Sequence, residues 1–418
     1  MSADGYLIFL PAHDIQELCM HSRTEVSFGH MVEHYFSTRY TGFGANNATF
    51  LKGTKLGIVS NGSTFIPALF DEAESSISRI FGAPSPTDDD GYVRINVTYA
   101  AGQITAQTMA RSFVGKGLSR SRDWVDGQLA YMNFVWAAAR GIQAWPRWLQ
   151  PLVYRFVKGY RDLRDEECRI ADRLQPEFDA ARLGLAGKGR EHTLMDDLLS
   201  VTPSAKQEDV MFHMTLQYQL ILTAMHPMSE TMWQILYDLA VYPHCQEILR
   251  EELSGVDRTD TQSWLSQVPK MDSFMKESQR HHSIALATMT RKVLKPIQLS
   301  TGLSIPAGCQ VSYMTDAVNK DPKRWTNPFE FDPLRFYKLQ NSLDDKPGQL
   351  NFGYGVQACP GRVYAAWTIK MLIAELVLKY DLKLSEGPGE GDMNRNFTVR
   401  SQRIGNPKAT ILARRRAA

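Results

Sequence analysis

One cysteine in a glycine-rich segment, directly before a long apolar stretch, constrains this chain more than any other feature of its sequence. The segment runs Phe352-Gly-Tyr-Gly-Val-Gln-Ala-Cys-Pro-Gly-Arg362, and residues 363–380 after it have the pattern of a buried helix. We expect Gly353, Gly355 and Gly361 to adopt left-handed backbone angles and to let the loop approach a flat ligand closely. The sequence therefore predicts a tight loop that presents one cysteine at the start of a core helix.

The position of Cys359 indicates a chemical role. At the N-terminus of a helix, the dipole and the free amides stabilise a thiolate. A thiolate held in this way is suited to be an axial ligand of haem iron. A lone cysteine beside a turn is more often an inert buried residue, but the glycine spacing and Phe352 favour a ligand here.

This segment resembles the signature of the cytochrome P450 family, Phe-x-x-Gly-x-x-x-Cys-x-Gly. Phe352, Gly355, Cys359 and Gly361 fill its four places. Gln357 departs from the family pattern, in which His or Arg is common at this position and reaches a haem propionate. The resemblance implies that haem b is bound through the thiolate of Cys359, with these residues around the cofactor.

Three charged residues resemble the family's buried Glu–Arg–Arg network. Glu277 and Arg280 are three positions apart, so a helix brings them to one face. Arg335 lies in Phe329-Glu-Phe-Asp-Pro-Leu-Arg-Phe336, which resembles the family segment that completes the network. A pair at this spacing is usually a solvated surface pair, whereas buried charges need pairing of this kind. We expect the network to have a structural role behind the cysteine loop.

Arg291 opens the strand-like region that follows this helix. Family members place an Arg at the corresponding position against a haem propionate, and a guanidinium suits a carboxylate well. The alternative is a solvated arginine at a strand edge. A further basic contact to haem is expected from the N-terminal third, where Lys52 and Lys55 are the candidates.

Residues 210–240 resemble the family helix that crosses the oxygen-binding face of the haem. Family members of the fungal type often read Ala-Ile-His-Thr-Thr-Ser there, and this chain reads Ala224-Met-His-Pro-Met-Ser229. The resemblance places Ala224, His226, Met228 and Ser229 at the catalytic face. The family's acid and alcohol relay protons to dioxygen at this face.

Pro227 stands at the position of the acid and Met228 at that of the alcohol. Proline lacks an N–H, so we expect a kink and an unpaired carbonyl at Thr223. Methionine cannot relay a proton. Ser229, Thr231, an ordered water or a substrate hydroxyl are the candidates that could compensate. Without compensation we expect a desaturation, a rearrangement, an oxidative coupling or an isomerisation.

Composition excludes several other classes. Hydrophobic residues make up 43% of the chain, charged residues 22%, and the net charge is only +2, which argues against a nucleic-acid partner. The cysteines are odd in number and widely spaced, without a CxxC pair, so neither a disulfide framework nor a structural zinc site is expected. They are Cys19, Cys168, Cys245, Cys309 and Cys359.

The predicted fold class is mainly α with a small β portion, as a cytochrome P450-like single domain over residues 1–418. The N-terminal anchor and first helix of the family are expected to be absent. Residues 1–60 read as short strands and turns, and residues 289–313 as short strands. Helical periodicity covers residues 121–139, 153–174 and 210–240, and Pro176 predicts the end of the second of these helices.

Two segments bear on membrane contact. Residues 210–229 lack Asp, Glu, Lys and Arg and could cross a bilayer, but their amides and imidazoles favour a core helix. Residues 145–158 mix Trp, aliphatic and basic residues, which suits either a peripheral membrane contact or a helix packed on the core. We expect an intracellular protein, in the cytoplasm or on the cytosolic face of the endoplasmic reticulum.

The leading functional prediction is a haem-thiolate monooxygenase that oxidises an apolar small molecule. The resemblance implies secondary metabolism, with a terpenoid, polyketide or alkaloid substrate. The chain has no flavin or nicotinamide motif, so electrons from NADPH are expected to come through a partner NADPH–cytochrome P450 reductase. The alternatives are a haem-thiolate isomerase or lyase, and an inactive remnant.

Overall fold

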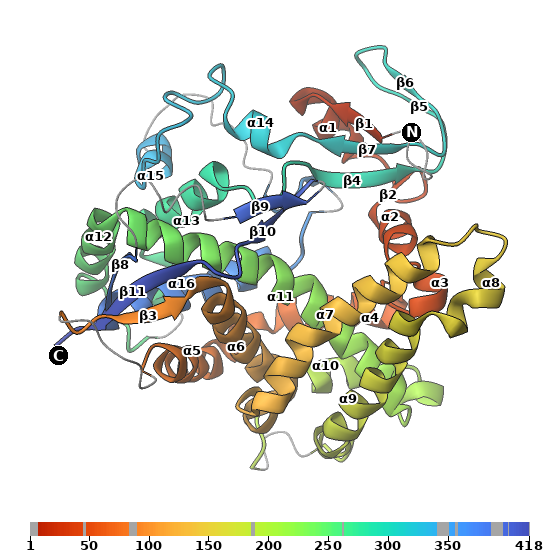
Figure 1. Cartoon of the computed structure of the whole chain (residues 1–418), viewed down its shortest axis with the longest axis horizontal. Coiled ribbons are helices and arrows are strands. Elements are labelled where there is room, and N and C mark those ends of the chain that lie inside the picture. Colours follow the sequence, from red (N-terminus) through yellow and green to blue (C-terminus); the bar gives the residue numbers. More distant parts are fainter. Residues whose placement is uncertain are drawn as a thin grey trace.

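The computed structural model describes residues 7–44, 47–82, 90–184, 189–260, 263–340, 351–355, 358–385, 396–399 and 401–417. Within these ranges helices dominate, and short strands form small sheets at one end and along one side (Figure 1). The predicted class, mainly α with a small β portion, is confirmed.

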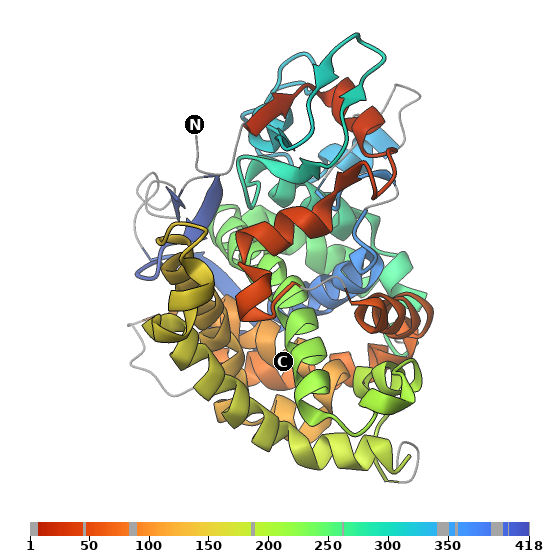
Figure 2. The same ribbon diagram turned by 90° about the vertical axis from the view of Figure 1, so that its right-hand side faces the viewer.

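The first sixty residues are more helical than the sequence predicts. Ser27 and Asn47 each cap a helix, since their side chains accept hydrogen bonds from the backbone amides of His30 and Thr49. Helix α2 runs from the sheet toward the helical body (Figure 2). The elements are β1 (Leu7–Leu10), α1 (Ala12–Leu18), β2 (Val26–Ser27), α2 (Phe28–Tyr35), α3 (Thr38–Thr41), α4 (Ala48–Thr54), the π-helix η1 (Lys55–Ser60) and the 3-10 helix η2 (Gly62–Phe65).

The helical body follows, with further 3-10 turns. Asn96, Ser121 and Asp209 cap the long helices α6, α7 and α11 through their side chains. The elements are α5 (Ile66–Phe81), α6 (Val97–Ser119), α7 (Arg122–Gln143), α8 (Gln150–Val153), η3 (Tyr154–Phe156), α9 (Lys158–Arg182), α10 (Leu194–Ser200), η4 (Ser204–Lys206), α11 (Val210–Val241), α12 (Pro243–Ser254), η5 (Ser263–Ser266) and α13 (Pro269–His281).

The predicted break at Pro176 is wrong, because α9 continues through it to Arg182. A proline inside a helix removes one backbone hydrogen bond and crowds the preceding turn. Leu174, Phe178 and Ala181 around it are buried in the core. The packing of this apolar face outweighs the local cost, as tertiary contacts generally do for amphipathic helices.

Helix α11 passes through the middle of the molecule, between the small sheets and the other long helices (Figure 1). Most of its side chains are buried, so the segment without charges is a core helix, as expected. The helix also continues through Pro227, and the kink predicted there stays a prediction. Among the described residues, no helix is both long enough and apolar enough to cross a bilayer.

The remaining elements form small sheets and the last helices. In the larger sheet the order is β1-β7-β4-β2, and β1 runs parallel to β7 with Leu7 opposite Gln310, which joins distant parts of the chain. The elements are β3 (Val93–Asn96), β4 (Thr288–Val293), β5 (Ile297–Gln298), β6 (Ser304–Ile305), β7 (Gln310–Tyr313), α14 (Thr315–Asn319), α15 (Arg335–Gln340), α16 (Arg362–Lys379), β8 (Tyr380–Leu384), β9 (Asn396–Val399), β10 (Gln402–Gly405) and β11 (Thr410–Arg415).

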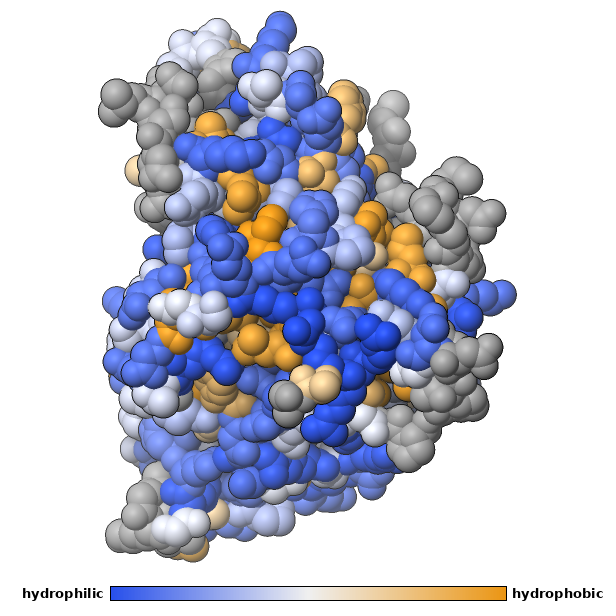
Figure 3. All heavy atoms as spheres, turned by 90° about the vertical axis from the view of Figure 1, so that its left-hand side faces the viewer, coloured by the Kyte–Doolittle hydropathy of each residue, from blue (hydrophilic) through white to orange (hydrophobic). Residues whose placement is uncertain are grey.

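Apolar side chains reach the protein surface in separate patches and around α8. The face in Figure 3 is mainly hydrophilic, with separate apolar patches. Around α8, the side chains of Trp148, Leu152 and Phe156 are largely exposed, so this segment is not packed on the core. The suggested membrane contact of residues 145–158 stays a prediction.

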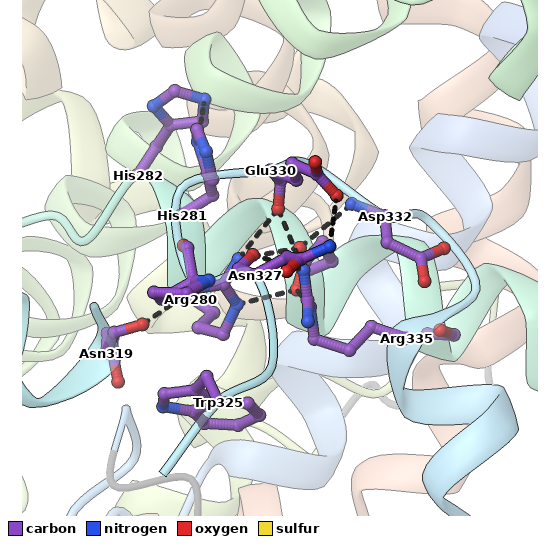
Figure 4. Close-up of polar contacts among 12 residues, drawn as sticks. Arg280, His281, His282, Asn319, Trp325, Asn327, Glu330, Asp332 and Arg335 are labelled. Atoms are coloured by element: carbon purple, nitrogen blue, oxygen red, sulfur yellow. Dashed lines mark hydrogen bonds and ion pairs between the residues drawn. The ribbon is translucent and has the colours of Figure 1, made fainter. Parts of the chain in front are cut away.

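A buried carboxylate ties α13 to the segment before α15. Glu277 is fully buried, and its two oxygens lie 2.7 and 2.8 Å from Arg280 nitrogens and 3.0 Å from Nε of Arg335. The guanidinium of Arg280 also lies over the ring of Trp325. Figure 4 shows the two arginines converging from opposite sides.

The outer nitrogens of both arginines bind backbone carbonyls. Arg280 donates to the carbonyls of Asn319, Pro328 and Glu330, and Arg335 to those of Thr326, Asn327 and Glu330. Each guanidinium therefore pairs its charge with Glu277 and uses its remaining donors to fix an irregular loop. Buried charges are tolerable only when they are satisfied in this way.

We predict that Glu277→Gln lowers the free energy of unfolding by about 3–5 kcal/mol, because it leaves two buried guanidinium groups without their counter-charge. Urea denaturation of the purified protein measures this. Glu208→Gln is the control, since it removes an exposed pair with Arg182 and should cost less than about 1 kcal/mol. Equal stability of the two variants would contradict the prediction.

Candidate functional site

The cysteine loop folds back on itself before α16. The Cys359 amide donates to the Phe352 carbonyl over 2.8 Å, and the Ala358 amide donates to the Gly355 carbonyl over 3.1 Å. Gly361 then starts α16, whose apolar side chains anchor it in the core. These contacts hold Cys359 just before the N-terminus of α16, as the sequence predicts.

Two of the loop glycines have the backbone angles expected of them. Gly353 and Gly355 have positive φ of 74° and 67°. A Cβ on Gly355 would lie 2.6 Å from the Cys19 carbonyl oxygen, so the loop packs directly on the end of α1. Gly361 differs from the prediction, because its φ is −85°, which any residue can adopt.

The Cys359 thiol is partly accessible, and burial raises its pKa. The backbone amide of Gly361 and the charge of Arg362 act in the opposite direction, as the helix N-terminus predicts, but they are the smaller effects. The protein alone therefore favours the neutral thiol. A bound metal ion deprotonates a coordinating thiol outright. Gln357 lies outside the described residues.

Arg291 on β4 is a buried cation. It is only 4% exposed, its Nη1 donates to the Thr290 carbonyl, and its guanidinium lies over the ring of Phe28. Its Nε has no hydrogen-bond acceptor, and no carboxylate in the described part of the chain forms an ion pair with it. Burial accordingly lowers the pKa of Arg291. A buried guanidinium with unused donors fits an anionic group such as a carboxylate.

The middle of α11 has an accessible face although the helix is central. Thr223 is exposed, and Ala224, His226 and Ser229 are partly accessible, whereas the stretch from 231 to 240 is buried. The His226 side chain is 45% exposed, yet burial lowers its pKa.

The predicted catalytic residues are not equivalent. Met228 is only 4% exposed and belongs to the main core. The Ser229 hydroxyl is buried without a hydrogen-bond partner among the described residues. Thr231 donates to the Pro227 carbonyl, so its hydroxyl proton is already in use. Ser229 is therefore the better candidate for replacing the missing alcohol.

Sequence reasoning missed Glu230, which also lies on this stretch of α11. Burial raises its pKa to about 7, and Nε1 of Trp233 donates to Oε2 over 2.6 Å. The signal was present in the sequence, because Glu230 is the first charged residue after the twenty uncharged ones. A carboxyl with such a shift is a candidate functional group.

The basic residues Lys52 and Lys55 are both exposed at the junction of α4 and η1. The Glu277 network lies behind the loop, and one contact joins the two. Nδ2 of Asn351, directly before Phe352, donates to Oε1 of Gln279 on α13 over 3.3 Å. Gln279 lies between Glu277 and Arg280 in the sequence, so the helix that carries the network, α13, also contacts the segment directly before the cysteine loop.

The residues present fit a haem group. Cys359 is partly exposed, Gly355 allows the close approach of its loop to the end of α1, and Arg291 has a buried Nε without an acceptor among the described residues. Thiolate and guanidinium are the groups that bind haem iron and its carboxylates.

Comparisons with known proteins place these features in one family. The profile described as Cytochrome P450 matches residues 122–406. Cytochrome P450 monooxygenase braC of Annulohypoxylon truncatum is 29% identical over 421 residues, which covers 96% of this chain and 82% of that protein. Ent-kaurene oxidase of Gibberella intermedia is 29% identical over 349 residues, which covers 79% of this chain and 64% of that protein.

Solved structures show the same fold. The retinoic acid-bound cyanobacterial CYP120A1 superimposes with a TM-score of 0.72 at 16% sequence identity, over 98% of this chain and 89% of that one. The family profile alone spans more than half of the sequence. The chain therefore belongs to the cytochrome P450 family of haem-thiolate oxidoreductases of the monooxygenase type.

Proposed function

We propose that this chain oxidises an apolar small molecule in fungal secondary metabolism and that Cys359 is the axial ligand of its haem. The observation that carries the proposal is the position of the partly exposed Cys359, held by the Phe352 contact at the start of α16. The names of the fungal relatives, monooxygenases and an ent-kaurene oxidase, support an apolar substrate. Electrons would come from a separate NADPH–cytochrome P450 reductase.

The roles of the surrounding residues follow from their contacts. When bound, haem with a thiolate ligand supplies the activation of dioxygen by electrons from the reductase. Cys359 would hold the iron, and Arg291 would hold a haem carboxylate with the donors that have no acceptor among the described residues. The accessible face of α11, from Thr223 to Glu230, would line the substrate space. Ser229 would hold a proton or a water there.

We predict that Cys359→Ala abolishes the thiolate-type carbon-monoxide difference band of the reduced protein, because no sulfur remains at the iron. Absorption spectra of the purified protein measure this. Cys168→Ala on the exposed face of α9 is the control and should keep the band. A retained band in Cys359→Ala would overturn the ligand assignment.

We predict opposite effects of Arg291→Met on stability and on haem binding. The substitution removes a buried unpaired charge, so the haem-free protein should gain about 1–3 kcal/mol of unfolding free energy. Haem should transfer to apomyoglobin at least about tenfold faster, because a charge-assisted hydrogen bond is lost. Arg291→Lys should have a stability and a rate of haem transfer between those of wild type and Arg291→Met. Unchanged haem transfer in Arg291→Met would show that Arg291 does not hold the cofactor.

We predict that Met228→Thr raises the fraction of NADPH consumption that yields product, because it restores a hydroxyl to α11. Met228→Val has the same shape without the hydroxyl and should not raise this fraction. The ratio of product to NADPH is measured with purified reductase, on the compound that accumulates when the gene is deleted. Equal coupling in the Thr and Val variants would count against a missing relay.

A further inference from the structure

The carboxyl group of Glu230 is held in a fixed orientation on the accessible face of α11. Trp233, one turn further on, donates its indole N–H to Oε2 over 2.6 Å. The Trp233 ring packs against strand β10, where a Cβ on Gly405 would lie 3.3 Å from it. Trp233 is only 2% exposed, so this buried ring holds the carboxyl that it binds in one orientation.

The second oxygen of this carboxyl, Oε1, has few hydrogen-bond donors near it among the described residues. The His226 ring lies close to it, but Nδ1 is 4.0 Å from Oε1, which is too long for a hydrogen bond. Burial lowers the pKa of His226, so the ring is neutral near pH 7. On β10 the charged side chain is Arg403, and it is engaged with Asp316 and with the Ser283 carbonyl.

A carboxyl in this setting lacks a positive partner. Its raised pKa has burial as the main cause, and the hydrogen bond from Trp233 is the only opposing effect. Buried carboxylates are stable when they are paired with a cation or receive several hydrogen bonds. A ligand that brings a protonated nitrogen to Oε1 would supply both, and the ligand would gain a charge-assisted hydrogen bond.

We propose that Glu230 is the polar anchor of the substrate space and binds a protonated nitrogen on an otherwise apolar substrate. The proposal rests on the proposed function and narrows its substrate to a basic, nitrogen-bearing scaffold. Trp233 positions the carboxylate, and the neighbouring His226 ring is partly exposed and neutral, so it does not take the place of a cationic partner. The apolar remainder of the substrate would pack along Thr223 and Pro227 on the same face of α11.

The test compares two probes of equal shape on the haem-loaded protein. N,N-dimethyl-1-adamantanamine is protonated at pH 7.5, and 1-isopropyladamantane replaces its nitrogen with carbon. Equilibrium dialysis measures the affinity of each probe without any need for turnover. We expect wild type to bind the amine about 10–100 times more tightly than the hydrocarbon, as a charge-assisted hydrogen bond allows.

Glu230→Gln keeps the shape and the acceptor for Trp233 but removes the charge. It should lower the affinity for the amine at least tenfold and change that for the hydrocarbon less than twofold. Glu230→Asp should retain part of the preference, and the surface variant Glu208→Gln should retain all of it. Thermal unfolding and the carbon-monoxide band of each variant show that the fold and the haem are intact.

Each outcome decides the proposal. Loss of the amine preference in Glu230→Gln alone supports the anchor. Equal binding of both probes by wild type, or an unchanged preference in Glu230→Gln, overturns it. Unchanged binding together with poorer coupling in Glu230→Gln also overturns it and indicates a proton-transfer role. A wild type without a thiolate band contradicts the proposed function instead, because dialysis reads only the probe.

Discussion

The buried carboxylate of Glu277 is the interaction on which the cysteine side of the molecule depends. One negative charge satisfies two guanidinium groups, and these fix the carbonyls of an irregular loop between residues 319 and 330. An irregular loop has no hydrogen-bond ladder of its own, so its carbonyls need donors from elsewhere, and the two arginines provide them. The contact between Asn351 and Gln279 extends the same support to the cysteine loop. The position of Cys359 is thereby tied to charge pairing on α13.

The other side of the candidate site is formed by α11. Pro227 and Met228 stand where the resemblance predicts an acid and an alcohol, and the helix continues through both, with most of its side chains buried in the core. Two other polar groups lie on this stretch of α11. Ser229 has a buried hydroxyl without a described partner, and Glu230 has a carboxyl with one oxygen bound by Trp233. This arrangement favours recognition of a polar group within an apolar space.

The parts predictable from the sequence are those with a local cause. The glycines at fixed spacing predict the cysteine loop. The hydrophobic periodicity and the capping residues indicate the long helices. The helix end at Pro176 was predicted wrongly, because packing around Phe178 outweighs a local preference. The helices before residue 60 were missed because they are short, and the side-chain caps of α2 and α4 at Ser27 and Asn47 were not used in the prediction. Glu230 belongs to no motif, and although its place after twenty uncharged residues marks it in the sequence, its contact with Trp233 is visible only in the fold.

The most direct test of the central claim is X-ray absorption at the iron edge of the purified wild-type protein. We expect one sulfur atom in the first coordination shell of the iron, contributed by Cys359 from its loop before α16. A first shell that contains only nitrogen and oxygen would contradict it.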